Sequence, residues 1–335
     1  MSIAGTILRS RAVAALTSPH GVDRYLEQIN PMWAAKEVRA RVLDVRRETG
    51  GEHPVATITL QPTSTWRGHR AGQYVQVGVD LPGSRRTTRC FTISSAASVP
   101  GETIQLTVRA QGEQRPGQSV SRWLVERAQV GDIVHLSQAE GDFVLEESPA
   151  TPTNNHLLFL TGGSGITPAM SILRTLLRDG YDGKAGRRVT FLHFARSAED
   201  QIFAEELAQI AAADNDVDVV LRHGSVFSEF ELRRLVPSYA ATDTWACGPA
   251  TMLDLVRQPE AAHRAVQRCQ RGAVRRRRGR RRLLPLRQAG RQHRHDPARA
   301  GRGPGAAPDL RLSHGHLLLL HRHEVQRHRP QRPHR

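Results

Sequence analysis

Cysteine, aromatic residues and long hydrophobic runs are all scarce in this chain of 335 residues. Its three cysteines, Cys90, Cys247 and Cys269, provide neither a disulfide framework nor a paired C-x-x-C metal site. No apolar run approaches the roughly 18 residues of a membrane-spanning helix, and the N-terminus has no apolar core long enough for a secretory signal. These absences argue against the disulfide-rich secreted and membrane-spanning classes and favour a cytoplasmic protein.

Acidic residues are scarce only at the C-terminal end. The last 75 residues hold 21 arginines, no lysine and three acids, whereas residues 1–260 hold 27 basic and 29 acidic residues. The formal net charge of +16 therefore belongs to the tail. The remainder is a slightly acidic globular protein, long enough for two domains.

Residues 35–147 have the pattern of an antiparallel β-barrel. Six short segments are separated by Gly, Pro and Ser, and a helix is expected at residues 120–127 before the last of them. The predicted strands are residues 38–42, 55–60, 74–77, 90–93, 104–108 and 133–136. Residues 1–34 are an extension, in which Val22, Leu26 and Ile29 are expected to form an apolar stripe that packs on the barrel.

Residues 148–257 alternate strands with helices, which predicts a parallel sheet covered by helices on both faces. Strands are expected at residues 157–160, 189–194, 217–221 and 244–246, and helices at residues 168–177, 200–212, 229–235 and 250–256. Ligands of such sheets bind at the carboxyl ends of the strands, where residues 162–167 and 247–249 both fall.

Residues 157–170 have the order strand, glycine-rich loop, helix. The glycines of residues 162–165 allow backbone amides to approach a ligand, and the amides that open a helix carry partial positive charge. We expect Thr167 to cap the helix, Pro168 to take its first position, and the loop to bind an anionic group such as a pyrophosphate. On this motif alone, a glycine turn without a ligand is the alternative.

Arg89, Phe91 and Thr92 offer three groups that a flavin requires. These are a cation for its pyrophosphate, a flat side chain for its ring and a hydroxyl near its N5 atom. Arg89 and Phe91 share a face because side chains alternate along a strand. An ordinary barrel strand with an exposed arginine is the alternative.

This strand and five further motifs, in the same order, resemble the ferredoxin–NADP reductase superfamily, whose flavin motif is R-x-[FY]-[ST]. The resemblance covers about residues 36–256 and implies a flavin-binding barrel followed by a nucleotide-binding domain. The five other motifs are residues 71–74 (A-G-Q-Y), 117–124 (G-Q-S-V-S-R-W-L), 140–143 (E-G-D-F), 162–168 (G-G-S-G-I-T-P) and 247–249 (C-G-P).

The resemblance also implies roles for single residues. Arg89 would hold the flavin pyrophosphate, Phe91, in place of the commoner Tyr, would stack on the ring, and Thr92 would bond its N5 edge. Thr167 would lie between flavin and nicotinamide, and Cys247 near the position of hydride transfer, unless it is a buried structural cysteine. The implied catalytic residues are Thr92, Thr167 and Cys247; the implied cofactor-binding residues are Arg89, Cys90, Phe91, Thr92, Ser119, Val120, Ser121, Gly162, Gly163, Gly165, Ile166, Thr167, Pro168, Arg196, Ser197, Cys247, Gly248 and Pro249.

Arg196 and Ser197 follow the second strand of the nucleotide domain, where this family usually reads the adenosine ribose. An acidic residue there would favour NADH, whereas Arg and Ser can bond a 2′-phosphate. We therefore expect NADPH, with NADH as the second possibility. A solvated loop arginine is the alternative interpretation of Arg196.

Residues 20–33 narrow the resemblance to actinobacterial reductases that feed electrons to acyl-CoA desaturases and continue into a plant-type [2Fe–2S] ferredoxin domain. The tail, residues 258–335, is rich in Arg, His, Pro and Gly instead, and we expect it to be disordered. As written, it holds only Cys269 and cannot bind a four-cysteine cluster. Its arginine runs at residues 275–282 could bind nucleic acid, and its histidines at residues 314–323 a metal.

We favour a third interpretation, in which the tail is a frameshifted ferredoxin domain. Moving the reading frame of residues 311–327 by one nucleotide permits the C-x4-C-x2-C spacing of plant-type cluster ligation. Resequencing of the locus tests this interpretation. An intact reading frame that encodes the C-x4-C-x2-C motif supports it, and an unbroken present frame with an expressed basic C-terminus contradicts it.

Together these features predict a flavoprotein reductase that passes electrons from NADPH through FAD to an iron–sulfur acceptor, in a membrane acyl-CoA desaturase or an oxygenase system. A cytoplasmic protein, or one bound peripherally at the inner face of the membrane, suits this role. A stand-alone flavin or ferredoxin reductase is the alternative enzyme. A nucleic-acid-binding protein would rest on the tail alone, and no nucleic-acid partner is expected.

Overall fold

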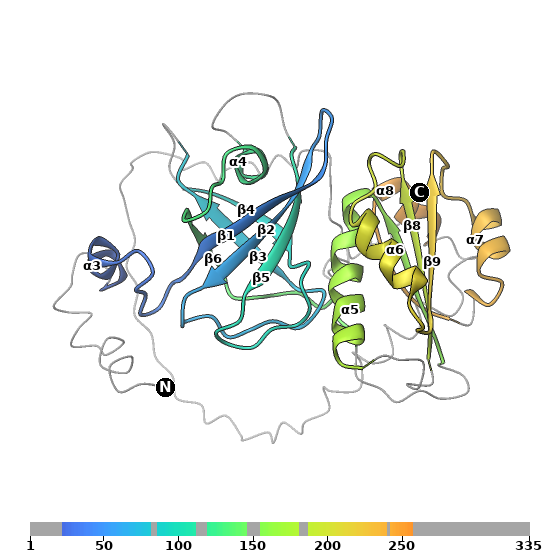
Figure 1. Ribbon diagram of the computed structural model, residues 1–335, viewed down its shortest axis with the longest axis horizontal. Helices are drawn as coiled ribbons and strands as arrows, with labels where there is room; N and C mark the ends of the chain where they lie inside the picture. Colours follow the sequence, from blue (N-terminus) through green and yellow to red (C-terminus); the bar gives the residue numbers. More distant parts are fainter. Residues whose placement is uncertain are drawn as a thin grey trace, which may run out of the picture.

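The computed structural model describes residues 22–81, 86–111, 119–145, 155–180, 187–239 and 242–256. Figure 1 shows two bodies: an antiparallel sheet that wraps into a barrel, and a parallel sheet flanked by helices, with α5 (Ile166–Arg178) between them. The predicted fold class is confirmed. The predicted tail and the boundary between residues 147 and 148 lie outside the described residues.

The barrel is a six-stranded sheet in which every pairing is antiparallel, with the order β4-β3-β6-β1-β2-β5. Its two ends meet where Ile93 bridges Leu106 and the Ser94 amide donates to the Gln105 carbonyl at 2.8 Å. The elements are β1 (Val38–Thr49), β2 (Val55–Pro62), β3 (Tyr74–Val79), β4 (Thr87–Thr92), β5 (Ile104–Arg109), α4 (Val120–Glu126) and β6 (Ile133–Leu136).

Strand β1 is much longer than the predicted segment of residues 38–42. Its pairing with β2 shifts register between Val42 and Asp44 and again between Arg47 and Thr49. Each shift of this kind changes which side chains face the core, so the period-two pattern that identifies a strand is lost after Val42.

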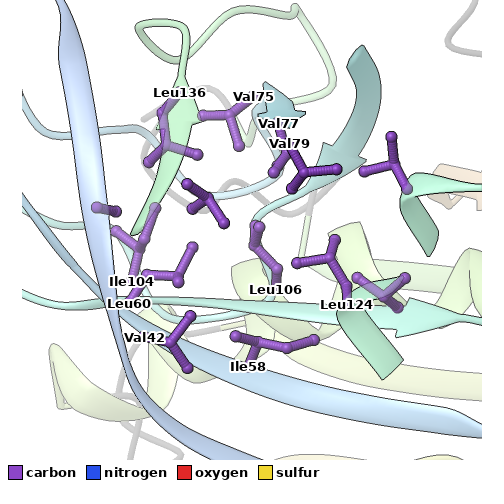
Figure 2. Close-up of a cluster of buried hydrophobic side chains, with 14 of the residues drawn as sticks. Val42, Ile58, Leu60, Val75, Val77, Val79, Ile104, Leu106, Leu124 and Leu136 are labelled. Carbon is purple, nitrogen blue, oxygen red and sulfur yellow. The ribbon is translucent and has the colours of Figure 1, made fainter. Parts of the chain in front are cut away.

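Alternate residues of the strands fill the interior of the barrel. Figure 2 shows aliphatic side chains from several strands meeting there, with Leu124 reaching in from α4. The labelled residues are Val42, Ile58, Leu60, Val75, Val77, Val79, Ile104, Leu106, Leu124 and Leu136. Helix α4 packs over one end of the barrel, against β2, β4 and β5.

Polar contacts attach the N-terminal helix α3 (Val22–Ile29) to the barrel. The Asp23 carboxylate accepts hydrogen bonds from the amides of Ala35, Lys36 and Glu37. The predicted apolar stripe is wrong in part, because Val22 is buried but Ile29 is 71% exposed. The buried carboxylate orients the helix instead, since its charge is stabilised by the three backbone donors.

The parallel sheet has the order β10-β7-β8-β9, and helices cover both faces. The α5 and α6 side of the sheet packs around Phe159 and Phe191, and the α7 and α8 side around Leu160 and Leu192. Its elements are β7 (His156–Gly162), β8 (Arg188–Ala195), α6 (Ala204–Ala212), β9 (Val217–His223), α7 (Glu229–Leu235), β10 (Asp243–Cys247) and α8 (Ala250–Val256).

The chain order reverses at β7, which lies between β8 and the last strand, β10. Such a switch point opens a crevice beyond the carboxyl ends of the two strands, where ligands of open α/β sheets bind. Among the helices of the described ranges, none is long and apolar enough to cross a membrane.

Helices α5 and α6 begin at other residues than predicted. A 3₁₀ turn, Gly163–Gly165, leads into α5, whose cap is Gly165; Thr167 lies in the first turn and donates to the Ser164 carbonyl at 3.1 Å. The prediction of Thr167 as the cap is therefore wrong. Pro168 is the third residue of the helix and not, as predicted, the first; it is tolerated there because the first amides of a helix lack intrahelical acceptors.

Helix α6 starts at Ala204, four residues later than expected. Phe203, the residue before it, has a φ of 59° and is the only non-glycine with a positive φ among the described residues. A left-handed residue cannot continue a right-handed helix, so the polar residues before it remain a loop.

The two domains touch where Gly72, in the loop before β3, meets α5 and the end of the barrel. Gly72 has a φ of 90°, and its amide donates to Ser171 Oγ of α5 at 3.2 Å. An added Cβ would lie 1.9 Å from the Phe143 carbonyl oxygen and 3.4 Å from Ile172 Cδ1. Only glycine suits this position.

Substitution of Gly72 tests how tightly its loop packs against Phe143 at the end of the barrel. Gly72→Ala is expected to lower the free energy of unfolding by about 3 kcal/mol, because backbone strain and a clash act together. Gly101→Ala is the matched control: its φ is 94° but no atom of the described residues lies within 4 Å, so only the strain, about 1 kcal/mol, remains. Urea denaturation measures both variants, and equal losses would contradict tight packing of Gly72 against Phe143.

Candidate functional site

The loop after β7 and the turn after β10 lie in direct backbone contact. An added Cβ at Gly165 would lie 2.4 Å from the Cys247 carbonyl oxygen and 2.8 Å from the Gly248 nitrogen. One at Gly162 would lie 3.0 Å from both Pro249 Cδ and Met252 Sδ. The structure thus brings together the two motifs that the sequence predicted at this edge, residues 162–168 and 247–249.

Gly163 faces the open side of this loop. Its φ is 55°, and an added Cβ would meet one described atom within 4 Å, Arg109 Nη1 at 3.9 Å. Arg109 ends strand β5 of the barrel, so a guanidinium from one domain lies beside the glycine loop of the other. Backbone amides next to an arginine suit a phosphate-bearing ligand.

Arg109 was absent from the residues predicted from the sequence. Burial and the nearby Arg196 lower its pKa, while Asp200 raises it, and a guanidinium nevertheless remains protonated at neutral pH. The available signal was a cation at the end of a strand that alternates apolar and polar residues. That signal is common, and only the pairing of the two domains gives it a site.

Arg196 and Ser197 lie on the loop after β8, at the same edge. Arg196 is 66% exposed and pairs with Asp200 at 3.2 Å, and Ser197 Oγ accepts a hydrogen bond from the Asp200 amide at 3.3 Å. An exposed ion pair of this kind is weak, so the guanidinium is free to turn toward an anion. The loop therefore presents a cation and a hydroxyl at the rim of the crevice.

Thr167 and Cys247 are both buried at the switch point. Burial raises the pKa of the Cys247 thiol to about 12, so this side chain is neutral at physiological pH. A protonated, enclosed thiol is neither a nucleophile nor an acid–base group. Its contribution to the site is a compact, uncharged surface.

A second buried polar group lies below this edge on β8. His193 is fully buried; its Nδ1 lies 2.8 Å from Thr161 Oγ1, and its Nε2 has no hydrogen-bond partner among the described residues. Burial, with a smaller effect of His223, lowers the pKa of His193 from 6.5 to about 3. The imidazole is therefore neutral beneath the crevice.

Strand β4 carries the predicted flavin residues. Arg89 and Cys90 are exposed, Phe91 is half-buried, and Thr92 is buried. Phe91 pairs with Val75 and Arg89 with Val77, which places the arginine and the aromatic ring on one face as expected. The Cys90 side chain alternates to the other face, and partial desolvation of its thiol raises its pKa, with a further contribution from Glu140.

Hydroxyl groups at the start of α4 bond to Gln111, the last described residue after β5. Ser119 caps the helix by accepting from the Arg122 amide, and it donates to the Gln111 carbonyl at 2.8 Å. Ser121 Oγ accepts from the Gln111 amide at 3.1 Å, and Val120 is buried. Both hydroxyls are used within the loop, so the atoms left for an anionic ligand are backbone amides. Gly117 and Gln118 of this motif lie outside the described residues.

Comparisons with known proteins agree with this geometry. Residues 159–258 match the family described as the oxidoreductase NAD-binding domain. The chain is 37% identical over 249 residues to an NADPH oxidoreductase of Mycobacterium tuberculosis, covering 73% of this chain and 62% of that protein. It is 29% identical to the glycine betaine monooxygenase reductase subunit of Chromohalobacter salexigens, and the match covers 68% of this chain and 61% of that protein. It thus spans a little over three fifths of the length of both relatives.

A solved structure gives the same fold. The flavohem-like FAD/NAD-binding domain of nitric oxide dioxygenase from Vibrio cholerae is similar with a TM-score of 0.55 and 26% identity. The match covers 66% of this chain and 91% of that domain.

One prediction concerns the neutral imidazole. Unfolded His193 has the ordinary pKa near 6.5, so below that pH the unfolded state binds a proton that the native state does not, and stability falls as the pH falls toward 3. Between pH 7.5 and 5 the wild type is expected to lose about 2 kcal/mol more than His193→Gln, which does not titrate. Urea unfolding at the two pH values measures this; a pH-independent difference between the proteins would contradict it.

Proposed function

Because its two described domains belong to the ferredoxin–NADP reductase-like oxidoreductases, we propose that the chain is an NADPH-dependent flavoprotein reductase that delivers electrons to an iron–sulfur acceptor. The main support for the proposal is the set of contacts at the switch point between β7 and β10. There the glycine loop and the C-G-P turn touch, and Arg109 of the barrel reaches the same loop. A crevice built from both domains suits a reaction between two bound cofactors.

On the barrel side, the chain's residues suit FAD. Arg89 is exposed and can pair with a pyrophosphate, Phe91 offers a half-buried ring for stacking, and Thr92 at the end of β4 has a hydroxyl for the N5 edge. The amides of Val120 and Ser121 are further donors to the pyrophosphate. These residues would hold FAD, which would supply hydride acceptance from a nicotinamide and single-electron release to the acceptor.

On the nucleotide side, the glycine loop and Arg109 suit the dinucleotide pyrophosphate. Ile166, Thr167 and Pro168 open α5 at the point where the nicotinamide would meet the flavin. Cys247 and Gly248 line the same point from β10, with the thiol held neutral by its raised pKa. These residues would therefore give the site of hydride transfer an uncharged lining.

The acceptor is proposed by class. The relative from Chromohalobacter salexigens is the reductase subunit of a monooxygenase, which supports an oxygenase component as the acceptor. A membrane acyl-CoA desaturase system, suggested by the resemblance of residues 20–33, is the alternative acceptor. In either case the [2Fe–2S] centre belongs to the acceptor or to a further domain, since the described residues hold two cysteines, Cys90 and Cys247.

An absorption spectrum of the purified chain before and after anaerobic NADPH tests the proposal. We expect a yellow protein whose visible flavin bands bleach on addition of NADPH, and faster than with NADH. A protein that stays colourless after incubation with FAD, or that binds FAD but is not bleached by either nucleotide, would contradict the proposed function.

Arg196 is expected to set the preference for NADPH. Arg196→Gln should raise the KM for NADPH about 10-fold or more and leave the KM for NADH within about 2-fold, because only NADPH carries the 2′-phosphate that pairs with the guanidinium. Arg188→Gln is the matched control: this arginine is 65% exposed and pairs with Asp218, but at the opposite end of β8. Steady-state kinetics with both nucleotides measure the two KM values. An equal rise in the KM for NADH would contradict a contact between Arg196 and the 2′-phosphate.

A further inference from the structure

One face of α5 binds the segment that follows the flavin strand. Ser171 Oγ donates to the Ser95 carbonyl at 2.6 Å, and Thr175 Oγ1 accepts from the Ala97 amide at 2.9 Å. Arg174 Nη1 donates to the Ser94 carbonyl at 2.7 Å. These three residues lie on one face of the helix by their spacing, so α5 holds residues 94–97 along more than one of its turns.

Arg174 has more partners than the other two. Its Nε and Nη2 donate to the two carboxylate oxygens of Glu206, on α6, at 2.7 and 2.5 Å. Its Nη1 also reaches Gln105 Oε1 of β5 at 3.3 Å, and its Cζ lies 4.6 Å from the centre of the Phe203 ring. The side chain is only 14% exposed. One guanidinium thus joins α5 and α6 to the barrel segments at Ser94 and Gln105.

Arg174 and its partners belong to the same chain segments as three parts of the proposed site. Ser94 comes two residues after Thr92, where β4 ends. Arg174 shares α5 with Thr167, which lies in the first turn of the helix. Phe203 ends the loop that begins with Arg196, and its left-handed backbone, unusual for an aromatic residue, persists only where its surroundings hold it.

We propose that Arg174 is a positioning residue for hydride transfer: it fixes the flavin strand, the helix of the nicotinamide loop and the adenosine loop relative to one another. The inference rests on the proposed function. Hydride transfer requires the two reacting atoms at about 3–3.5 Å, and a displacement of about 1 Å costs about 100-fold in rate. Arg174 touches neither cofactor site, so it acts on the rate through this spacing.

A cavity beside Arg174 provides a specific test. It has a volume of about 330 Å³ and is lined by Arg174, Glu206 and Gln105, with Asp44, Arg46, Thr57 and Thr59 from β1 and β2. Removing the side chain in Arg174→Ala joins its space to this cavity. A guanidinium ion from solution can then enter and meet the Glu206 carboxylate, which has lost its partner.

The experiment compares the full wild-type chain with Arg174→Ala, Arg174→Lys and the control Arg188→Ala in rapid-mixing measurements of flavin reduction by NADPH. We expect the limiting rate to fall about 10- to 100-fold in Arg174→Ala, with the NADPH dissociation constant within about 2-fold of wild type. Arg174→Lys should restore little, because one ammonium cannot reproduce the planar fork. Millimolar guanidinium should raise the rate of Arg174→Ala, and sodium at the same concentration should not.

Hydrogen exchange gives a readout that needs no cofactor. The peptide that contains residues 94–97 should exchange faster in Arg174→Ala than in wild type, and not in Arg188→Ala. Three outcomes would each overturn the positioning role and leave the proposed function intact. They are a wild-type rate of flavin reduction in Arg174→Ala, a loss of NADPH affinity in proportion to the loss of rate, and unchanged hydrogen exchange of residues 94–97. A wild-type flavin that NADPH does not reduce would overturn the proposed function, and the role that rests on it.

Discussion

No side chain fits between the loop that precedes α5 and the turn that follows β10. A Cβ at Gly165 would lie 2.4 Å from the Cys247 carbonyl oxygen, so two backbone segments from neighbouring strands touch directly. The contact requires glycine in the loop and brings the opening of α5 to the edge of the crevice. The positions of Thr167 at the start of the helix and of Arg174 further along it depend on that contact.

Helix α5 then serves two domains with two different faces. Met170 and Leu173 pack on the parallel sheet, whereas Ser171, Arg174 and Thr175 bond the barrel. Burial of the apolar face stabilises the packing without fixing its orientation, because the hydrophobic effect is not directional. The hydrogen bonds of the polar face are directional. Apolar packing alone would tolerate sliding of one domain over the other, so the directional bonds define their relative position.

Charge in the site is divided between rim and floor. Arg109 and Arg196 bring positive charge to the rim, whereas Cys247 and His193 below it are neutral because burial disfavours their charged forms. A dinucleotide with anionic phosphates and an uncharged reacting ring would match this division. The same burial makes native stability depend on pH through His193.

The sequence by itself determined the two domain types, their order and the edge that carries the loops. Apolar and polar side chains alternate along half-buried strands, and glycine-rich turns mark the ends of strands. Both signals can be recognised within a few residues. It misplaced the cap of α5, which follows a 3₁₀ turn, and the start of α6, which follows the left-handed Phe203. It also underestimated the extent of β1, where register shifts interrupt the local pattern.

Only the tertiary structure decided which side chains join the domains. Arg174 bonds a carbonyl 80 positions away and a carboxylate 32 positions away, and Arg109 reaches Gly163 from another domain. No local periodicity encodes such pairs, because each depends on how two independently formed surfaces dock. That is the physical reason why Arg109 and Arg174 escaped prediction while Gly162, Gly165 and Cys247 did not.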